Sequence, residues 1–143
     1  MAQALAHQAC RQGFRVLFVN TYKMLQHLNG GRADGTFERC MQSCLRPDLL
    51  VLDDFGLKPL RPPAQEDFYD VISGGYECGS ILLTSNRDLM EWPELFKAPL
   101  LASAELDRLA HNADVVIITG RSHRAHGDGS SHAIQGSAQI GNA

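Results

Sequence analysis

Two adjacent carboxylates, Asp53 and Asp54, end an apolar run that begins at Leu49. A buried strand that carries paired acids at its end is typical of a cation site, because carboxylate oxygens are preferred ligands of Mg²⁺ and Ca²⁺. Acids also suit turns, so the pair alone leaves a simple turn before Gly56 as the alternative. Which of the two applies depends on the other groups that the fold brings to these acids.

Helical and apolar stretches alternate along the chain, which predicts an α/β fold: a three-layer parallel sheet covered by helices on both faces. We expect strands at 15–20, 49–55, 80–86 and 115–120. We expect helices at 2–11, from Thr21, around Cys40, after Pro62-Pro63 and within 100–113. The segment 29–35 (NGGRADG) is predicted to be a loop, and Gly74-Gly75 to end the helix that follows the prolines.

The carboxyl ends of parallel strands meet at one edge of a sheet, where ligands bind in folds of this class. The expected strands end at Asn20, at Asp53-Asp54, at Thr84-Ser85-Asn86 and at Thr119-Gly120-Arg121. Two acids, an amide and a nearby arginine together favour a site for phosphate and magnesium.

The composition excludes some partners and leaves others open. The 143 residues carry a net charge of −3, with 44% hydrophobic and 20% charged residues, as in ordinary globular proteins. Contact with DNA would therefore need a local basic patch or an assembly. No stretch is apolar enough for a membrane helix and the first residues do not form a signal peptide, so we expect a cytoplasmic protein.

The four cysteines show no CxxC pairing. Cys40 and Cys44 share one helical stripe with Phe37, Met41 and Leu45, which indicates a buried helix face. Free core thiols are therefore favoured over a metal site, which would need further ligands at suitable positions.

Three segments carry a resemblance to a known family: LLVLDDFG, ILLTSNR, and LDRL followed by VVIITGRSHR. In this order and spacing they resemble the nucleotide-binding domain of the IstB-like family, helper ATPases of bacterial insertion sequences. These are related to the DnaC helicase loaders within the AAA+ class. The resemblance runs to Arg124, so we expect an ATPase domain at 1–124 and a disordered Gly/Ser-rich tail at 125–143.

The resemblance implies a role for each residue at the strand ends. Asp53 would belong to the shell of a Mg²⁺ that bridges the terminal phosphates of ATP, and Asp54 would orient or deprotonate the attacking water. Asn86 would be the sensor amide between the Walker B acid and the γ-phosphate. From the residues alone, Asn86 is equally well explained as a turn residue after a strand.

Two arginines are implied to act on the phosphates as well. Arg108 resembles the arginine finger that completes the site of the next subunit, and Arg124 resembles a phosphate-sensing arginine. Without the resemblance, a solvated helix arginine is the better interpretation of Arg108. The implied protein is a homo-oligomer with a heterologous interface, which acts on DNA and assists a transposase.

The sequence departs from the family pattern at the phosphate cradle. None of its segments matches GxxxxGK[ST], the P-loop that would supply backbone amides and a lysine to the phosphates. The family places that loop, and the strand before it, ahead of a helix that MAQALAHQ resembles. We therefore expect a family member truncated at its amino terminus, whose core lacks its first strand and whose ATP binding and hydrolysis are impaired.

Other protein classes share parts of this pattern. A non-enzymatic interaction module, which pairs with intact subunits or with transposase, is the main alternative. A phosphoacceptor receiver domain would need a third Asp alone at a strand end and a Lys after the last strand, where Asn20 and Arg121 stand. A dinucleotide dehydrogenase would need GxGxxG after a strand, a pattern that the sequence lacks.

Overall fold

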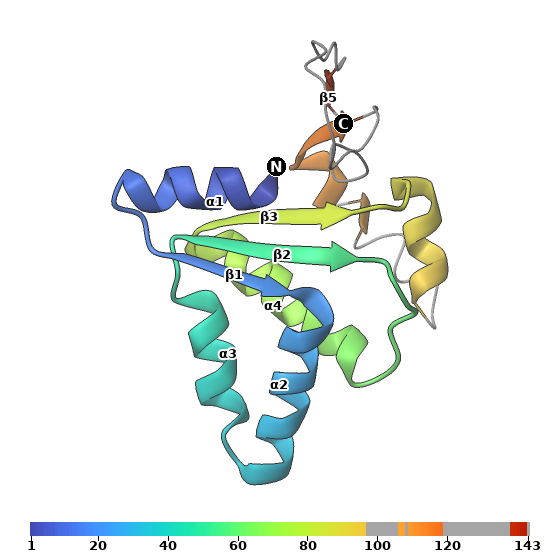
Figure 1. Cartoon of the computed structure of the whole chain (residues 1–143). Helices are drawn as coiled ribbons and strands as arrows, with labels where there is room; N and C mark the ends of the chain where they lie inside the picture. Colours follow the sequence, from blue (N-terminus) through green and yellow to red (C-terminus); the bar gives the residue numbers. More distant parts are fainter. Residues whose placement is uncertain (97–105, 108, 119–137, 143) are drawn as a thin grey trace, which may run out of the picture. The chain divides into compact units, whose positions relative to one another are not determined.

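A computed structural model describes residues 1–96, 106–107, 109–118 and 138–142 of the chain (Figure 1). These residues fall into two compact units, Met1–Pro99 and Leu100–Ala143, each with strands of its own.

The first unit is built on a three-stranded parallel sheet. Its strands are β1 (Val16–Asn20), β2 (Leu49–Phe55) and β3 (Ser80–Ser85), and β2 lies in the middle. Each strand contains a continuous run of apolar residues, which is the pattern of strands covered on both faces. The three predicted strands of this unit are therefore confirmed, with parallel pairing.

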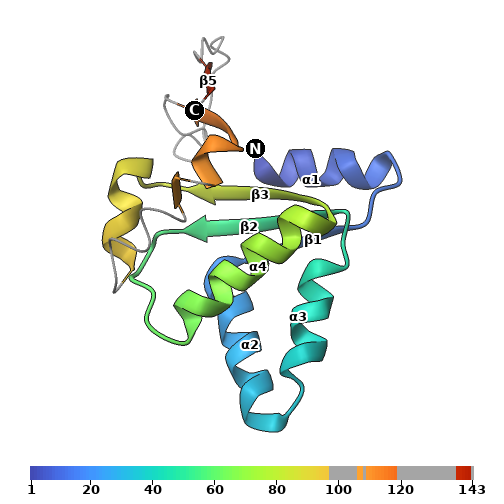
Figure 2. The same ribbon diagram turned by 180° about the vertical axis from the view of Figure 1, so that it is seen from behind.

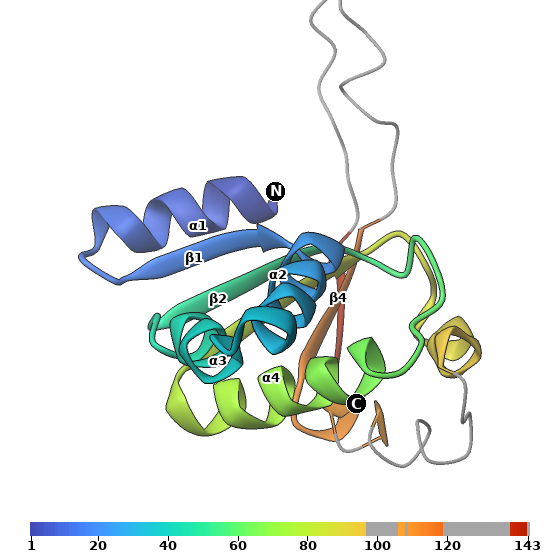
Figure 3. The same cartoon turned by 90° about the horizontal axis from the view of Figure 1, so that it is seen from below.

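Helices cover both faces of this sheet, which gives the predicted three layers. Helix α1 (Ala2–Arg11) lies against one face near β1, and α2 (Thr21–Asp34), α3 (Phe37–Leu45) and α4 (Ala64–Cys78) pack on the opposite face (Figures 1, 2 and 3). Among the described residues of this unit, the connection from β3 leads to a short 3₁₀ helix, η1 (Leu89–Leu95).

The buried core side chains come from β2 and from the three helices α2, α3 and α4. They are Leu50, Val51 and Leu52; Met24, Leu25 and Leu28; Cys40, Met41 and Cys44; and Phe68, Val71 and Ile72. Both core cysteines are free, and burial raises the pKa of the Cys44 thiol. The predicted buried face of the Cys40 helix is confirmed.

An aromatic cluster fixes the chain just beyond the paired acids. The ring of Phe55 stacks on Phe68 of α4 at 4.8 Å between centroids and meets Trp92 of η1 edge-on at 4.7 Å. Phe55 and Phe68 are fully buried. The last residue of β2 is therefore anchored to a helix and to η1, so the acids before it are attached to a rigid base.

The prediction that Gly74-Gly75 end their helix is wrong, because α4 continues through both to Cys78. A Cβ at Gly74 would lie 2.9 Å from Leu45 of α3, and one at Gly75 would lie 2.6 Å from Ile81 of β3. The two glycines thus permit close packing of α4 against its neighbours, which outweighs their low helix propensity of about 1 kcal/mol each relative to alanine.

The predicted loop at 29–35 is also mostly helical. Helix α2 runs through this segment to Asp34 and ends at Gly35, whose φ of 78° is the left-handed conformation that favours glycine at a helix end. Within the helix, Gly31 lies close to the start of α3, since a Cβ there would stand 2.9 Å from Phe37 Cα. Tertiary packing again decides the conformation.

The second unit contains two described strands, β4 (Asp114–Ile118) and β5 (Ala138–Asn142), which pair antiparallel. The strand expected at 115–120 is thus present over its described part. β5 falls inside the segment 125–143, which the sequence predicts to be disordered, and 125–137 lie outside the described residues. The domain boundary at 124 stays a prediction.

Candidate functional site

The carboxyl ends of the three parallel strands bring the predicted polar residues to one edge of the sheet. Asn20 at the end of β1 is in register with Asp53 of β2. The pairing of β2 with β3 is regular to Leu52 and shifts before Phe55, which pairs with Ser85. The register shift falls at Asp53 and Asp54. The backbone of the two acids therefore departs from the regular hydrogen-bond pattern of the sheet at its carboxyl edge.

Asp53 is held by hydroxyl groups from both neighbouring elements. Thr84 Oγ1 of β3 donates to the Asp53 carboxylate at Oδ1, 2.5 Å away. Thr21 Oγ1, which is completely buried at the start of α2, donates to the main-chain oxygen of Asp53 at 3.0 Å. These two contacts fix the backbone and one carboxylate oxygen of a half-buried acid.

Asp54 has a different environment and an unusual backbone conformation. Its φ is 59°, and it is the non-glycine residue with positive φ among those described. Aspartate tolerates this region better than most residues, yet such strain concentrates at functional sites. Its side chain is exposed, and its N–H donates to Thr84 Oγ1 at 3.1 Å.

The start of α2 joins the same edge through Asn20. The amide oxygen of Asn20 caps the helix by accepting from the N–H groups of Tyr22 and Lys23, at 3.1 and 3.3 Å. Its Nδ2 donates to Asp54 Oδ2 at 3.4 Å. One side chain therefore terminates a strand, caps a helix and contacts the exposed acid.

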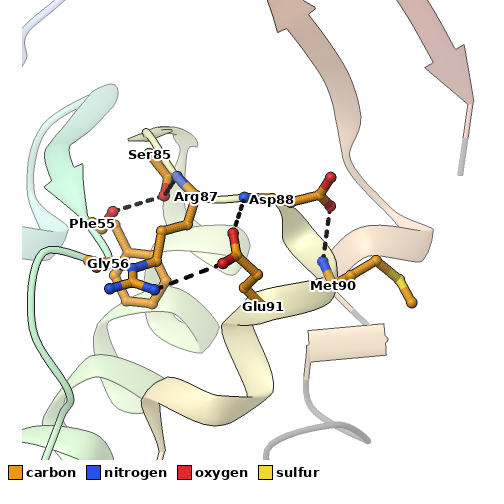
Figure 4. Close-up of polar contacts among 7 residues, drawn as sticks. All are labelled: Phe55, Gly56, Ser85, Arg87, Asp88, Met90 and Glu91. Carbon is orange, nitrogen blue, oxygen red and sulfur yellow. Dashed lines mark hydrogen bonds and ion pairs between the residues drawn. The ribbon is translucent and has the colours of Figure 1, made fainter.

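The turn after the acids is closed by the last residue of β3 and by residues that follow it (Figure 4). Ser85 Oγ donates to the carbonyl of Phe55 at 2.7 Å, and Arg87 Nε donates to the carbonyl of Gly56 at 2.5 Å. Arg87 also forms an ion pair with Glu91 at 3.8 Å. Gly56 has a φ of 93°, and a Cβ there would stand 3.1 Å from Ser85 Oγ. The turn thus requires glycine.

The structure describes three of the five predicted site residues and leaves two outside. Asp53 and Asp54 meet at the edge, and Asn86 lies exposed one residue beyond β3. Arg108 and Arg124 lie outside the described residues. The predicted roles of all five stay predictions.

Sequence reasoning gave no role to Thr84 or Arg87, although both hold the acids' segment in place. The sequence signal for Thr84 was its position at the end of an apolar strand, next to the candidate amide. Arg87 contacts a backbone carbonyl rather than an acid of the site, so charge pairing in the sequence does not reveal it.

The donor set at the edge fits Mg²⁺ but does not by itself enclose an ion. Within the part of the chain that the structure describes, no group of three or more His, Cys, Asp and Glu side chains could hold a metal. Mg²⁺ usually keeps several waters and binds through one or two carboxylates together with substrate phosphates. Asp53, with Oδ1 fixed by Thr84, and Asp54 match that pattern.

The opposite end of the sheet carries an unrelated ion pair. Asp48 before β2 accepts from the N–H and guanidinium of Arg15 before β1, at 2.8 to 3.2 Å. Hydrogen bonds from Arg15 lower the pKa of Asp48 to about 2, and the pair is exposed. It joins the starts of two strands and has no part at the acid edge.

The layered fold defines an α/β protein whose parallel sheet carries two acids at its carboxyl edge. The solved structures with similar folds include a DNA replication initiation factor, at a TM-score of 0.62 and 21% identity over 75% of this chain and 33% of that one. They also include the replication initiator DnaA bound to AMPPCP and single-stranded DNA, at 0.62 and 22%, over 73% and 33%.

The model of the IstB-like ATP binding protein family matches residues 1–131. The chain belongs to this family. An insertion sequence ATP-binding protein of Sinorhizobium fredii is 36% identical over 124 residues, and one of Mycobacterium tuberculosis is 36% identical over 125. Each match covers 87% of this chain, which spans about half the length of these relatives, 51% and 50%. Among the described residues, no helix is long and apolar enough to cross a membrane.

Proposed function

We propose that this chain contributes the acid edge, meaning the carboxyl edge of the sheet that carries Asp53 and Asp54, to an ATP-dependent helper of transposition. There the two acids act on a Mg²⁺–ATP complex. The observation that carries the proposal is the meeting of both acids with Thr84 and Asn20 at the strand ends, in a member of an ATP-binding family.

In this proposal the two acids have separate tasks. Asp53 holds the metal through the carboxylate oxygen that Thr84 leaves available. A Mg²⁺ held there would supply positive charge to offset the charge that develops on the phosphates of ATP. Asp54 accepts a proton from, or orients, a water at the exposed side of the edge, and Asn86 donates its amide to the same region.

The remaining parts of the proposal concern the assembled protein. Arg108 of one subunit reaches the nucleotide of the next, and Arg124 contacts phosphate within its own subunit. The oligomer acts on DNA and delivers a transposase. These activities concern the whole protein, and the chain spans about half the length of the relatives that it matches.

We expect the 143-residue chain alone to bind ATP weakly and to hydrolyse it poorly, because its sequence contains no P-loop. Backbone amides and the lysine of such a loop supply most contacts to the phosphates in related folds. Asp53 and Asp54 would then contribute to ATP binding only through a bound Mg²⁺ ion.

Equilibrium titration of the chain with a fluorescent ATP analogue, with and without Mg²⁺, tests the proposal. Asp53→Asn should abolish the Mg²⁺-dependent part of binding. Asp70→Asn, which removes an equal charge from an exposed site on α4, should not change it. Equal behaviour of the two variants would contradict the role of Asp53. A folded chain without any binding would favour the interaction module instead.

A further inference from the structure

The turn that follows the paired acids contains two residues with left-handed backbone conformation. Asp54 has a φ of 59° and Gly56 a φ of 93°, on either side of the buried Phe55. An aspartate in this conformation is under strain and persists there only when surrounding contacts hold it. Since Asp54 is a candidate site residue, the contacts that fix this turn also fix part of the site.

Side chains of the segment 84–87 continue the pairing of β2 with β3 beyond the point where the backbone register breaks. Three hydrogen bonds join the two segments in the same order along the chain: from the Asp54 N–H to Thr84 Oγ1 (3.1 Å), from Ser85 Oγ to the Phe55 carbonyl (2.7 Å) and from Arg87 Nε to the Gly56 carbonyl (2.5 Å). Three successive residues of the turn are therefore held by side chains rather than by the sheet.

Arg87 also joins this turn to η1, as Figure 4 shows. Besides its hydrogen bond to the Gly56 carbonyl, the guanidinium lies 3.8 Å from the Glu91 carboxylate. Glu91 accepts in turn from the N–H of Asp88 at 3.0 Å, as part of the capping box that begins η1. One planar guanidinium thus contacts the turn with one nitrogen and η1 with another, a geometry that a lysine ammonium does not reproduce.

Asn86 lies inside the segment that these contacts hold. Its two neighbours, Ser85 and Arg87, both donate to carbonyls of the turn, and the Arg87 N–H donates to Ser85 Oγ at 3.1 Å. The backbone on both sides of Asn86 is therefore fixed to the turn that carries Asp54. Asn86 and Asp54 are themselves exposed, so a ligand at the edge can reach both.

The packing of the turn has a separate origin from its orientation. The buried Phe55 ring stacks on Phe68 and meets Trp92 edge-on, and these apolar contacts anchor the turn in the interior. The Arg87 side chain is 40% exposed, and exposed ion pairs contribute little to stability. Loss of the Arg87 contacts should therefore change the orientation of the turn more than the stability of the fold.

We infer that Arg87 is a positioning residue of the candidate site: it holds the turn that carries Asp54 and the segment that carries Asn86 in one relative arrangement. The inference rests on the proposed function, since it names the residue that directs both side chains toward the same Mg²⁺–ATP complex. It assigns Arg87 no contact with the nucleotide or the metal.

The first test needs no ligand: amide hydrogen exchange of the whole 143-residue chain, followed by NMR. Arg87→Met should speed exchange of the Asp54 N–H severalfold, although the acceptor of that N–H, Thr84 Oγ1, is untouched. Arg39→Met removes an exposed cation from α3 and should leave this exchange unchanged. An unchanged exchange rate at Asp54 in the Arg87 variant would overturn the inference.

The second test is titration with the fluorescent ATP analogue, with and without Mg²⁺. Arg87→Met should lower the Mg²⁺-dependent affinity about tenfold, as do other residues that orient the groups around a bound metal, with little change in the urea midpoint. Arg87→Lys keeps the charge but not the contact with both partners, and it should bind as weakly. Added methylguanidinium should restore part of the affinity to Arg87→Ala.

Wild-type affinity in Arg87→Lys would assign the effect to charge alone and would overturn the inference. So would an affinity of Arg87→Ala that does not respond to methylguanidinium. Circular dichroism verifies that each variant is folded, and Arg87→Lys decides the question should Arg87→Met not fold.

Asp53→Asn separates this inference from the proposed function. If it leaves ATP binding unchanged while Arg87→Met still speeds exchange at Asp54, then Arg87 sets the turn and the role of the acids is rejected. If Asp53→Asn abolishes the Mg²⁺-dependent binding and Arg87→Met does not alter it, the acids are retained and the role of Arg87 is rejected.

Discussion

The Thr84 hydroxyl donates to Asp53 Oδ1 and at the same time accepts from the backbone N–H of Asp54. A single oxygen on β3 therefore ties down both consecutive acids of β2, at the point where the ladder between these strands loses its regular register. The position of the acid pair depends on this neighbour as much as on its own strand.

Thr84→Val should lower the free energy of unfolding by about 1–3 kcal/mol, because a half-buried carboxylate and an N–H lose their partner while the shape is kept. It should also weaken the Mg²⁺-dependent binding of ATP. Thr84→Ser keeps the hydroxyl and is the control. Urea unfolding measures the first effect, and equal midpoints for the Val and Ser variants would contradict it.

Gly75→Ala should destabilise the chain by about 1–3 kcal/mol, because its methyl group would stand 2.6 Å from Ile81 Cδ1 in a packed core. Gly30→Ala is the matched control, since it is also within a helix and meets nothing within 4 Å. There the change should stabilise by about 1 kcal/mol. Opposite signs in thermal unfolding are expected, and the same sign for both would refute the packing argument.

Arg32→Met should destabilise the chain by about 3–5 kcal/mol. Arg32 of α2 forms an ion pair with Asp67 of α4, whose side chain is completely buried and whose Oδ2 has no hydrogen-bond partner among the described residues. Without the arginine, an unpaired charge remains in the core. Adding Asp67→Asn should recover part of the loss in urea unfolding. A second substitution that costs further stability would show that the buried charge is not the cause.

The stability of the chain should fall in acid partly through Asp48. Arg15 lowers the folded-state pKa of Asp48 to about 2, below the ordinary value of 3.8. The stabilisation is therefore present above the unfolded pKa and is lost as pH falls toward 2. The difference in urea midpoint between the wild type and Asp48→Asn should be largest at neutral pH and shrink across this window. A difference that is constant with pH would exclude this assignment.

The strands and the acid edge could be predicted from sequence because their signals are local. Continuous apolar runs mark covered parallel strands, and polar residues at their ends must then share an edge. Asn20 and Asp53 are an example, because each ends a parallel strand and the two residues lie opposite each other in the sheet.

What the sequence did not predict depends on contacts between distant segments. Gly31 and Gly75 signal helix breaks locally, yet both lie inside helices because a neighbouring segment approaches too closely for a side chain. Arg87 was missed for a similar reason, since its partner is a carbonyl 31 positions away that only the fold brings near.

The position of Asn20 has a consequence for communication within the first unit. Its amide joins the carboxylate of Asp54 to the first turn of α2, and Tyr22, two residues on, holds the backbone of Lys58. A ligand that draws the Asp54 carboxylate away removes one partner of the amide that caps the helix. The acids, the first turn of α2 and the loop after β2 are therefore linked by one continuous series of hydrogen bonds.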